Sequence, residues 1–168
     1  MKKEELFKRE QEKWMSNISL KNNFHLNDIH LVAGIDIAYW TEGKYDYGVC
    51  CIVVIDYITK QIIEEVEYSG QIDVPYISGY LAFRELPLII EAVKKLKCQP
   101  DLYMFDGNGH LHYRNMGIAT HASFYLNKPT IGVAKSYLKI KNTDFQMPKN
   151  EKGNFTCIKV DGEVFGAA

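Results

Sequence analysis

The order of hydrophobic patterns along the chain limits its fold more than any other feature of the sequence. Between residues 29 and 70 there are three successive runs with the apolar and β-branched content of strands, and after residue 78 helical and strand patterns alternate. The predicted strands are residues 29–38, 47–57, 60–70, 100–106 and 129–135, the predicted helices are residues 2–16, 78–96 and 117–127, and residues 155–168 are a predicted hairpin around Asp161-Gly162. A meander of strands followed by alternating helices and strands implies one mixed β-sheet.

This order predicts an α/β fold with a mixed β-sheet flanked by helices on both faces, which is the layout of a ribonuclease H-like domain. The pattern by itself also fits other α/β folds. No internal repeat, low-complexity tract or flexible linker marks a second domain, so residues 1–168 are expected to form a single domain. Within residues 78–96, Pro87 cannot donate to the carbonyl group of Phe83, which predicts a kink or two abutting helices.

The composition excludes several classes of protein. With 46% apolar residues, 24% charged residues and a formal charge of −1, the chain is neither disordered nor collagen-like. It has no apolar run of membrane-spanning length and no signal-peptide pattern, so we expect a cytoplasmic protein without membrane association. The four cysteines lack zinc-site spacing and are expected to be buried, reduced thiols: Cys50, Cys51, Cys98 and Cys157.

The charge is unevenly distributed along the chain. Residues 56–73 carry a net charge of −4, whereas residues 128–152 carry +4, including six lysines. The near-zero total argues against binding of nucleic acid by bulk electrostatics. The lysines of residues 128–152 are either a solvated face or a source of contacts to phosphate groups.

Three acidic residues stand out because of where they occur. Asp36 interrupts an apolar strand, Asp106 ends another strand before Gly107-Asn108-Gly109, and Glu85 lies on a helix expected to pack on the sheet. Each has an ordinary interpretation: a salt-bridged or strand-end residue for Asp36, a turn former for Asp106 and an exposed helix residue for Glu85. Should they meet at one end of the sheet, they would supply the oxygen ligands that Mg²⁺ or Mn²⁺ prefers. Such a site is typical of phosphodiester hydrolysis.

Several histidines and a lysine accompany these carboxylates. His110, His112 and His121 follow Asp106, but no thiolate or third suitably spaced histidine favours zinc, so hydrogen bonding or phosphate contact is the preferred interpretation. Lys135 ends the strand at residues 129–135, where it is either a phosphate-facing lysine or an ordinary edge-strand lysine.

Six segments stand out together in their order and spacing: Val32-Ala33-Gly34-Ile35-Asp36, Pro75-Tyr76-Ile77-Ser78-Gly79, Phe83-Arg84-Glu85, Asp106-Gly107-Asn108-Gly109 with His112, Gly117-Ile118-Ala119-Thr120-His121, and Pro129-Thr130-Ile131-Gly132-Val133-Ala134-Lys135-Ser136. These segments resemble the motifs of the endonuclease V family. The resemblance implies a Mg²⁺-dependent endonuclease, with Mn²⁺ as the alternative metal, that recognises deoxyinosine in DNA or inosine in RNA. It further implies hydrolysis of a nearby phosphodiester on the 3′ side of that base, giving 3′-hydroxyl and 5′-phosphate ends, in DNA repair or RNA processing.

The resemblance also implies roles for individual residues. Asp36, Glu85 and Asp106 become metal ligands and, with Lys135, the catalytic residues. Residues 75–79 are similar to the family's wedge, so Tyr76 is expected to insert beside the displaced base. The residues expected to line the base pocket or contact the nucleic acid are Gly79, Leu81, Gly107, His112 and Ile118.

The chain also departs from the family pattern. Ser78 and Tyr113 stand where prolines are common, Asn108 where histidine or glutamine is frequent, and Tyr137 where arginine is frequent. The family normally continues past residue 168 with a strand, a histidine-bearing loop near the metal and a final helix. We therefore expect an uncovered edge at the carboxyl-terminal hairpin, leading to self-association, or a longer natural chain. The alternative function is an inosine-binding module with impaired catalysis.

A third hypothesis, another ribonuclease H-like nuclease such as a junction resolvase, has less support because the Pro-Tyr-Ile-x-Gly segment suits a protein that reads a single altered base. No motif separates DNA from RNA as the substrate.

Overall fold

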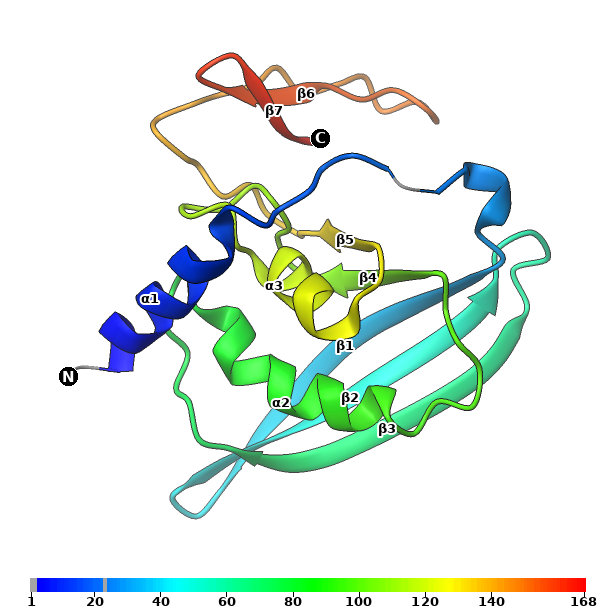
Figure 1. The fold of residues 1–168 in the computed structure, drawn as a ribbon, viewed down its shortest axis with the longest axis vertical. Helices are drawn as coiled ribbons and strands as arrows, with labels where there is room; N and C mark the ends of the chain where they lie inside the picture. The colour runs from blue at the N-terminus through cyan, green and yellow to red at the C-terminus, as the bar shows by residue number, and fades with distance from the viewer. Residues whose placement is uncertain (1–2, 23) are drawn as a thin grey trace.

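The computed structural model describes residues 3–22 and 24–168 (Figure 1). Its elements in chain order are α1 (Lys3–Met15), the 3₁₀ turn η1 (Leu26–Asp28), β1 (Leu31–Glu42), β2 (Tyr45–Asp56), β3 (Ile62–Ile72), α2 (Leu81–Val93), β4 (Leu102–Asp106), α3 (Ile118–Leu126), β5 (Thr130–Val133), β6 (Cys157–Val160) and β7 (Glu163–Ala167). Each strand and helix predicted from the sequence is therefore present, with ends shifted by a few residues.

The main sheet has five strands in the order β3-β2-β1-β4-β5. The first three strands form an antiparallel meander, whereas β4 runs parallel to both β1 and β5. This mixed sheet confirms the predicted fold class. The antiparallel β6–β7 hairpin turns at Asp161 and Gly162, both of which have positive φ angles, and it forms a separate sheet.

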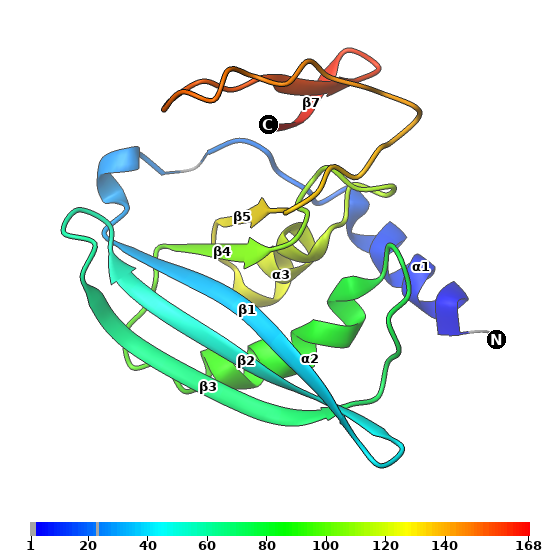
Figure 2. The same cartoon turned by 180° about the vertical axis from the view of Figure 1, so that it is seen from behind.

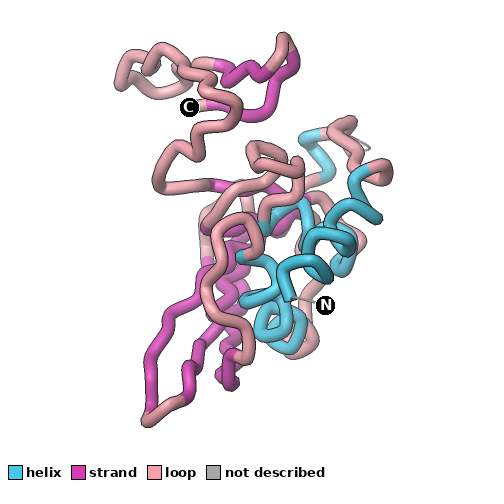
Figure 3. The backbone as a smooth tube through the Cα atoms, turned by 90° about the vertical axis from the view of Figure 1, so that its left-hand side faces the viewer, coloured by secondary structure: helices cyan, strands magenta, loops and turns pink. Residues whose placement is uncertain are grey.

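The described helices all lie on one side of the main sheet, whereas the sequence predicted helices on both faces. Figure 2 shows the strands in front of α2 and α3, and Figure 3 shows the three α-helices gathered on one side. The two crossovers, β3-α2-β4 and β4-α3-β5, advance in the same direction along the sheet. Because such crossovers are right-handed, both helices must cover the same face. The hairpin lies apart from this layer, at one end of the molecule (Figure 3).

The core fills the space between the sheet and α2 and α3. Along β1, Ala33, Ile35 and Ile37 are buried on this side, while Gly34 and Asp36 alternate onto the other face. α2 runs continuously through Pro87, so two abutting helices do not form. Pro87 is tolerated because its neighbours are strongly buried: Leu86, Leu88 and Ile89.

The expectation of four buried cysteines is corrected by the same alternation. Cys50 is buried on the helix side of β2, so the next residue, Cys51, faces the opposite side and is exposed. Cys157 is exposed on the hairpin and Cys98 is half-buried. All four thiols are free. None of the described helices is both long enough and apolar enough to cross a membrane.

Candidate active site

Asp36 and Asp106 lie on neighbouring parallel strands. Gly34 pairs with Met104 and Ile35 with Phe105, so the next step along both strands brings the two aspartates beside each other. Asp36 lies two residues after Gly34 on β1, and Asp106 lies two residues after Met104 on β4. Because side chains alternate between the two faces of a strand, both aspartates point toward the face opposite the helices. Asp36 is exposed and Asp106 is half-buried. In α/β proteins, ligand sites commonly lie at the carboxyl ends of parallel strands.

Glu85 lies on α2, on the helix-bearing side of the sheet, and is buried, with 9% of its surface exposed. Burial, and to a smaller extent the charges of Asp36 and Asp106, raise the pKa of its carboxyl group to about 7. The Tyr39 hydroxyl donates a hydrogen bond to Oε1 of Glu85, which lowers the pKa of Glu85 but does not cancel the effect of burial. The three acidic groups are therefore close enough to influence one another electrostatically.

Lys135 stands two residues beyond β5 and forms an ion pair with Asp106. This hydrogen bond, together with the charges of Asp106 and Asp36, raises the pKa of the lysine, so its ammonium group stays charged at neutral pH. The side chain is mostly exposed. Lys135 therefore places a positive charge at the aspartates while remaining accessible to an anionic ligand.

The suitability of these residues for a metal ion can be judged from their chemistry and charge. Among residues 3–22 and 24–168, no three acidic, histidine or cysteine side chains are gathered tightly enough to surround an ion as they stand. Glu85 is bound to Tyr39 and Asp106 to Lys135 instead. The three carboxyl groups nevertheless offer the oxygen donors that a hard divalent cation requires. Such a cation would also neutralise the repulsion between their negative charges.

The predicted base pocket brings most of its residues together. Gly107 has a φ angle of +149°, and a Cβ atom there would lie 2.7 Å from Cγ2 of Ile118 and 3.8 Å from Cδ2 of Leu81. Leu81, Gly107 and Ile118 thus meet beside the turn that follows Asp106. Tyr76, in the loop between β3 and α2, is 69% exposed. That exposure agrees with a residue available for contact and not with a core tyrosine.

His112 was expected to contact nucleic acid, but the structure places it beneath the loop of residues 75–79. It is buried, and its Nδ1 accepts a hydrogen bond of 3.3 Å from the backbone N–H of Arg114. Burial and then the Arg114 charge lower the pKa of His112 to about 4. A neutral, enclosed imidazole is suited to supporting the loop from inside.

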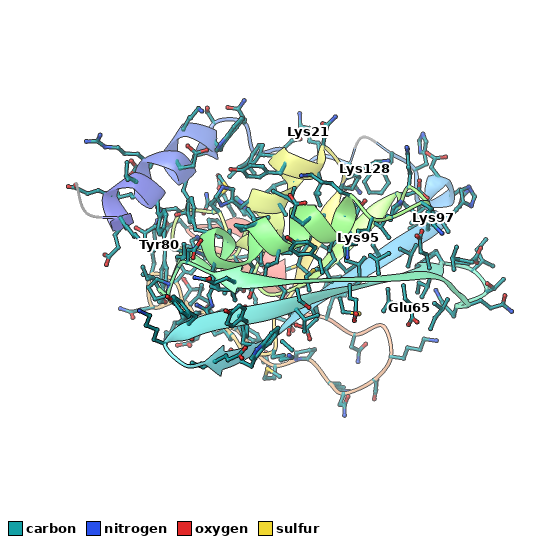
Figure 4. The ribbon with its side chains drawn as sticks, turned by 90° about the horizontal axis from the view of Figure 1, so that it is seen from below. Lys21, Glu65, Tyr80, Lys95, Lys97 and Lys128 are labelled. Carbon is teal, nitrogen blue, oxygen red and sulfur yellow. The ribbon has the colours of Figure 1, made fainter. Side chains whose placement is uncertain are left out.

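The lysines of residues 128–152 do not lie together on one surface. Lys128 lies near Asp101, whose pKa it helps to lower, at the amino-terminal end of β4 and thus at the opposite end of that strand from Asp106. Figure 4 shows Lys128 together with Lys95 and Lys97 on the helix-bearing side of β3. Lys139 and Lys141 pair with Asp144 and Asp161, respectively. Lys135, in the same segment, forms an ion pair with Asp106.

A cleft of about 1610 Å³ opens beside Lys135, between the loop after α1, the β4 and β5 strands and the β6–β7 hairpin. Its lining includes apolar side chains from the sheet face that carries no helix, such as Met104 and Ile131. His110 also lines it, and its ring lies 4.7 Å from that of Phe165 on the hairpin. The candidate active site is therefore bordered by an open groove.

Two polar residues near the site were not singled out from the sequence. Tyr39 lies three residues after Asp36 on β1, and its hydroxyl donates a hydrogen bond to Glu85. Gln11 of α1 is fully buried and donates a hydrogen bond to Gly79, at the end of the loop of residues 75–79. Gln11 has a detectable signal, because it lies four residues after Phe7 and three before Trp14, on the apolar face of the helix. A polar residue in such a stripe indicates a specific buried partner.

Comparison with known proteins gives a consistent result. The family model described as Endonuclease V matches residues 12–168. The protein named Endonuclease V from Bacillus thuringiensis subsp. konkukian (strain 97-27) is 62% identical over 160 residues, which are 95% of this chain and 68% of that protein.

Solved structures agree with this result. The crystal structure of the Bacillus subtilis endonuclease V superposes with a TM-score of 0.94 at 56% identity, covering 100% of this chain and 71% of that one. Endonuclease V of Ciona intestinalis, in complex with a 24mer DNA containing an inosine followed by a ribo-adenosine, has a TM-score of 0.85 at 28% identity, over 98% of this chain and 75% of that one. The chain therefore belongs to the endonuclease V family and has its ribonuclease H-like fold.

Proposed function

We propose that this protein is a Mg²⁺-dependent endonuclease, with Mn²⁺ as an alternative metal, which recognises deoxyinosine or inosine. It hydrolyses a nearby phosphodiester on the 3′ side of the base and leaves 3′-hydroxyl and 5′-phosphate ends, in DNA repair or RNA processing. The observation that carries the proposal is the pairing of β1 with β4, which sets Asp36 beside Asp106, together with the ion pair between Asp106 and Lys135. We also propose that residues 1–168 form a single catalytic domain.

The residues that would hold the metal are Asp36 and Asp106, on paired strands, and Glu85 on α2, which is near enough for their charges to raise its pKa. A divalent ion bound there would neutralise the phosphate, activate water and stabilise the leaving oxygen. Lys135 contributes separately, because its exposed ammonium group is held beside Asp106 and can bind a non-bridging phosphate oxygen. Tyr39 would hold the Glu85 side chain in one orientation, through the hydrogen bond that its hydroxyl donates to Oε1.

Recognition of the base would use a different set of residues. Tyr76 would stack in the space left by the displaced base, and Gly79, Leu81, Gly107 and Ile118 would line the pocket that receives it. Ile118 packs so closely on Gly107 that any side chain at this position would clash with it. The inosine-containing DNA in the Ciona intestinalis complexes supports this choice of substrate.

The test compares matched oligonucleotides that contain adenine, deoxyinosine or, in RNA, inosine. We expect cleavage of the inosine-containing strands with Mg²⁺ or Mn²⁺, no cleavage with a chelator, and ends that DNA ligase accepts because they carry a 5′-phosphate. Binding is measured in parallel by gel shift in Ca²⁺. Equal cleavage of the adenine strand would contradict base recognition. Inosine-specific binding without cleavage in either metal would contradict the endonuclease and support the inosine-binding alternative.

A further inference from the structure

Gln11 is a buried polar residue on α1, far in the sequence from every residue of the candidate site. No part of its surface is exposed. Its side-chain Nε2 donates to the carbonyl oxygen of Gly79 at 3.1 Å and to that of Met116 at 3.3 Å. Its Oε1 accepts a hydrogen bond of 2.5 Å from Nε of Arg114. Both the nitrogen and the oxygen of the amide group are therefore hydrogen-bonded, to residues at least 68 positions away in the chain.

These contacts converge on the end of the loop that carries Tyr76. Besides the bond from Gln11, the Gly79 carbonyl accepts one of 3.0 Å from Nη2 of Arg114. Gly79 has a φ angle of +81°, a conformation that most residues avoid. Two convergent donors hold this carbonyl in one direction, and because Gln11 and Arg114 also bond to each other, the three groups form a closed triangle.

Both donors are themselves held in place by aromatic contacts. The Arg114 guanidinium lies 4.4 Å from the ring centre of Tyr80, which Figure 4 shows at the end of α2 opposite Lys95. On either side of Gln11, Phe7 stacks on Phe83 at 4.1 Å and Trp14 on Phe124 at 5.0 Å. α1 is thus fixed to α2 and α3, so the position of Gln11 depends on the core of the protein.

We propose that Gln11 is a positioning residue for base recognition: from α1, it holds the loop of residues 75–79 in the conformation that presents Tyr76 to the nucleic acid. This inference rests on the proposed function of that loop. Glutamine is suited to the task because a single planar amide donates to Gly79 and accepts from Arg114. Glutamate would keep the contact to Arg114 but would lose the donor, and methionine would lose both.

The first test measures the loop without any substrate. Hydrogen exchange is followed in peptides covering residues 75–80 and, for comparison, β1 and β2, in the unmodified protein and in Gln11→Glu, Gln11→Met and Glu12→Gln. Glu12 is the adjacent α1 residue, with a half-exposed side chain paired to Lys8, and it serves as the matched control. We expect faster exchange at residues 75–80 in both Gln11 variants, with β1 and β2 unchanged and Glu12→Gln unaltered. Unchanged exchange at residues 75–80 in both variants would overturn the inference.

The second test measures discrimination between deoxyinosine and adenine oligonucleotides in Ca²⁺ and single-turnover cleavage in Mg²⁺. We expect Gln11→Met to weaken deoxyinosine binding about tenfold while adenine binding stays the same, and Gln11→Glu to have a smaller effect in the same direction. The cleavage rate at saturating substrate should change by less than about threefold. Preserved discrimination in both variants would refute the role of Gln11. If the unmodified protein itself does not discriminate, the proposed function fails, while the exchange result still decides whether Gln11 orders the loop.

Discussion

Asp106 is flanked by Lys135 and by the neighbouring carboxylates, so the loss of its charge should affect chemistry more than binding. We predict that Asp106→Asn lowers cleavage by more than about 100-fold, because an amide is a poor ligand for a hard cation, while the affinity for deoxyinosine DNA stays within about threefold. Cleavage rates and gel shifts measure the two effects. Asp144→Asn, which removes the exposed partner of Lys139, is the control and should leave both unchanged. Equal loss of binding and cleavage would indicate a structural role for Asp106.

Tyr76 is the second residue whose role can be separated from folding. Because its side chain is 69% exposed, Tyr76→Ala should leave the melting temperature almost unchanged. It should weaken binding of inosine-containing duplex by about 1 to 3 kcal/mol, the usual contribution of one stacked base. Tyr57→Ala removes an exposed tyrosine that directly follows β2 and serves as the control. A large fall in melting temperature would show that Tyr76 is a packing residue instead.

At the scale of elements, β5 packs closely against the turn that follows Asp106. A Cβ atom on Gly132 would lie 2.5 Å from the carbonyl oxygen of Gly107 and 2.6 Å from the carbonyl carbon of Asn108. We predict that Gly132→Ala destabilises the protein by about 3 kcal/mol and abolishes cleavage, because the turn must move and take Asp106 with it. Urea unfolding and cleavage assays measure this. Gly34→Ala is the control, since its nearest neighbour would be 4.0 Å away; similar stability of both variants would contradict the prediction.

α3 carries a histidine whose burial should make folding dependent on pH. His121 is fully buried and neither ring nitrogen has a hydrogen-bond partner in the described structure, so burial lowers its pKa to about 4. The unfolded chain, with an ordinary pKa near 6.5, binds more protons between these two values. Stability should therefore be greatest above pH 6.5 and fall toward pH 4, with His121 alone accounting for about 2 kcal/mol of loss by pH 5.

This pH dependence is measured by urea unfolding between pH 7 and pH 5. His121→Leu conserves most of the volume and removes the ring that must be charged, so it should flatten the dependence but leave the part due to His112, whose pKa is also about 4. An equally steep dependence in His121→Leu would show that other groups control it.

At the scale of the whole molecule, the β6–β7 hairpin leaves strand edges open. No further strand pairs with β6 or β7 in the described part of the chain, and Val164 is 49% exposed. We predict that the 168-residue chain self-associates through this hairpin, because unpaired edges recruit further strands. Light scattering should give a mass that rises with protein concentration, and Val164→Lys should abolish the rise. A monodisperse monomer at all concentrations would refute this.

The local features of this protein were determined by the sequence alone. The apolar, β-branched runs at residues 29–38 and 47–57, the Asp161-Gly162 turn and the helical spacing of α2 depend on interactions between near neighbours, so the elements and their order were predictable. The acidic residues and the motifs of the endonuclease V family were recognisable for the same reason. Residue type and spacing are properties of the chain itself.

Only the tertiary structure decided which of these features meet. The handedness of two successive crossovers placed α2 and α3 on one face of the sheet, and the packing of α1 buried Gln11 against Gly79. Tyr39 became the partner of Glu85, and His112, which was expected to contact nucleic acid, was buried beneath the loop of residues 75–79. Each of these outcomes joins residues distant in the chain, and their hydrogen bonds and burial depend on a packing geometry that no local pattern encodes.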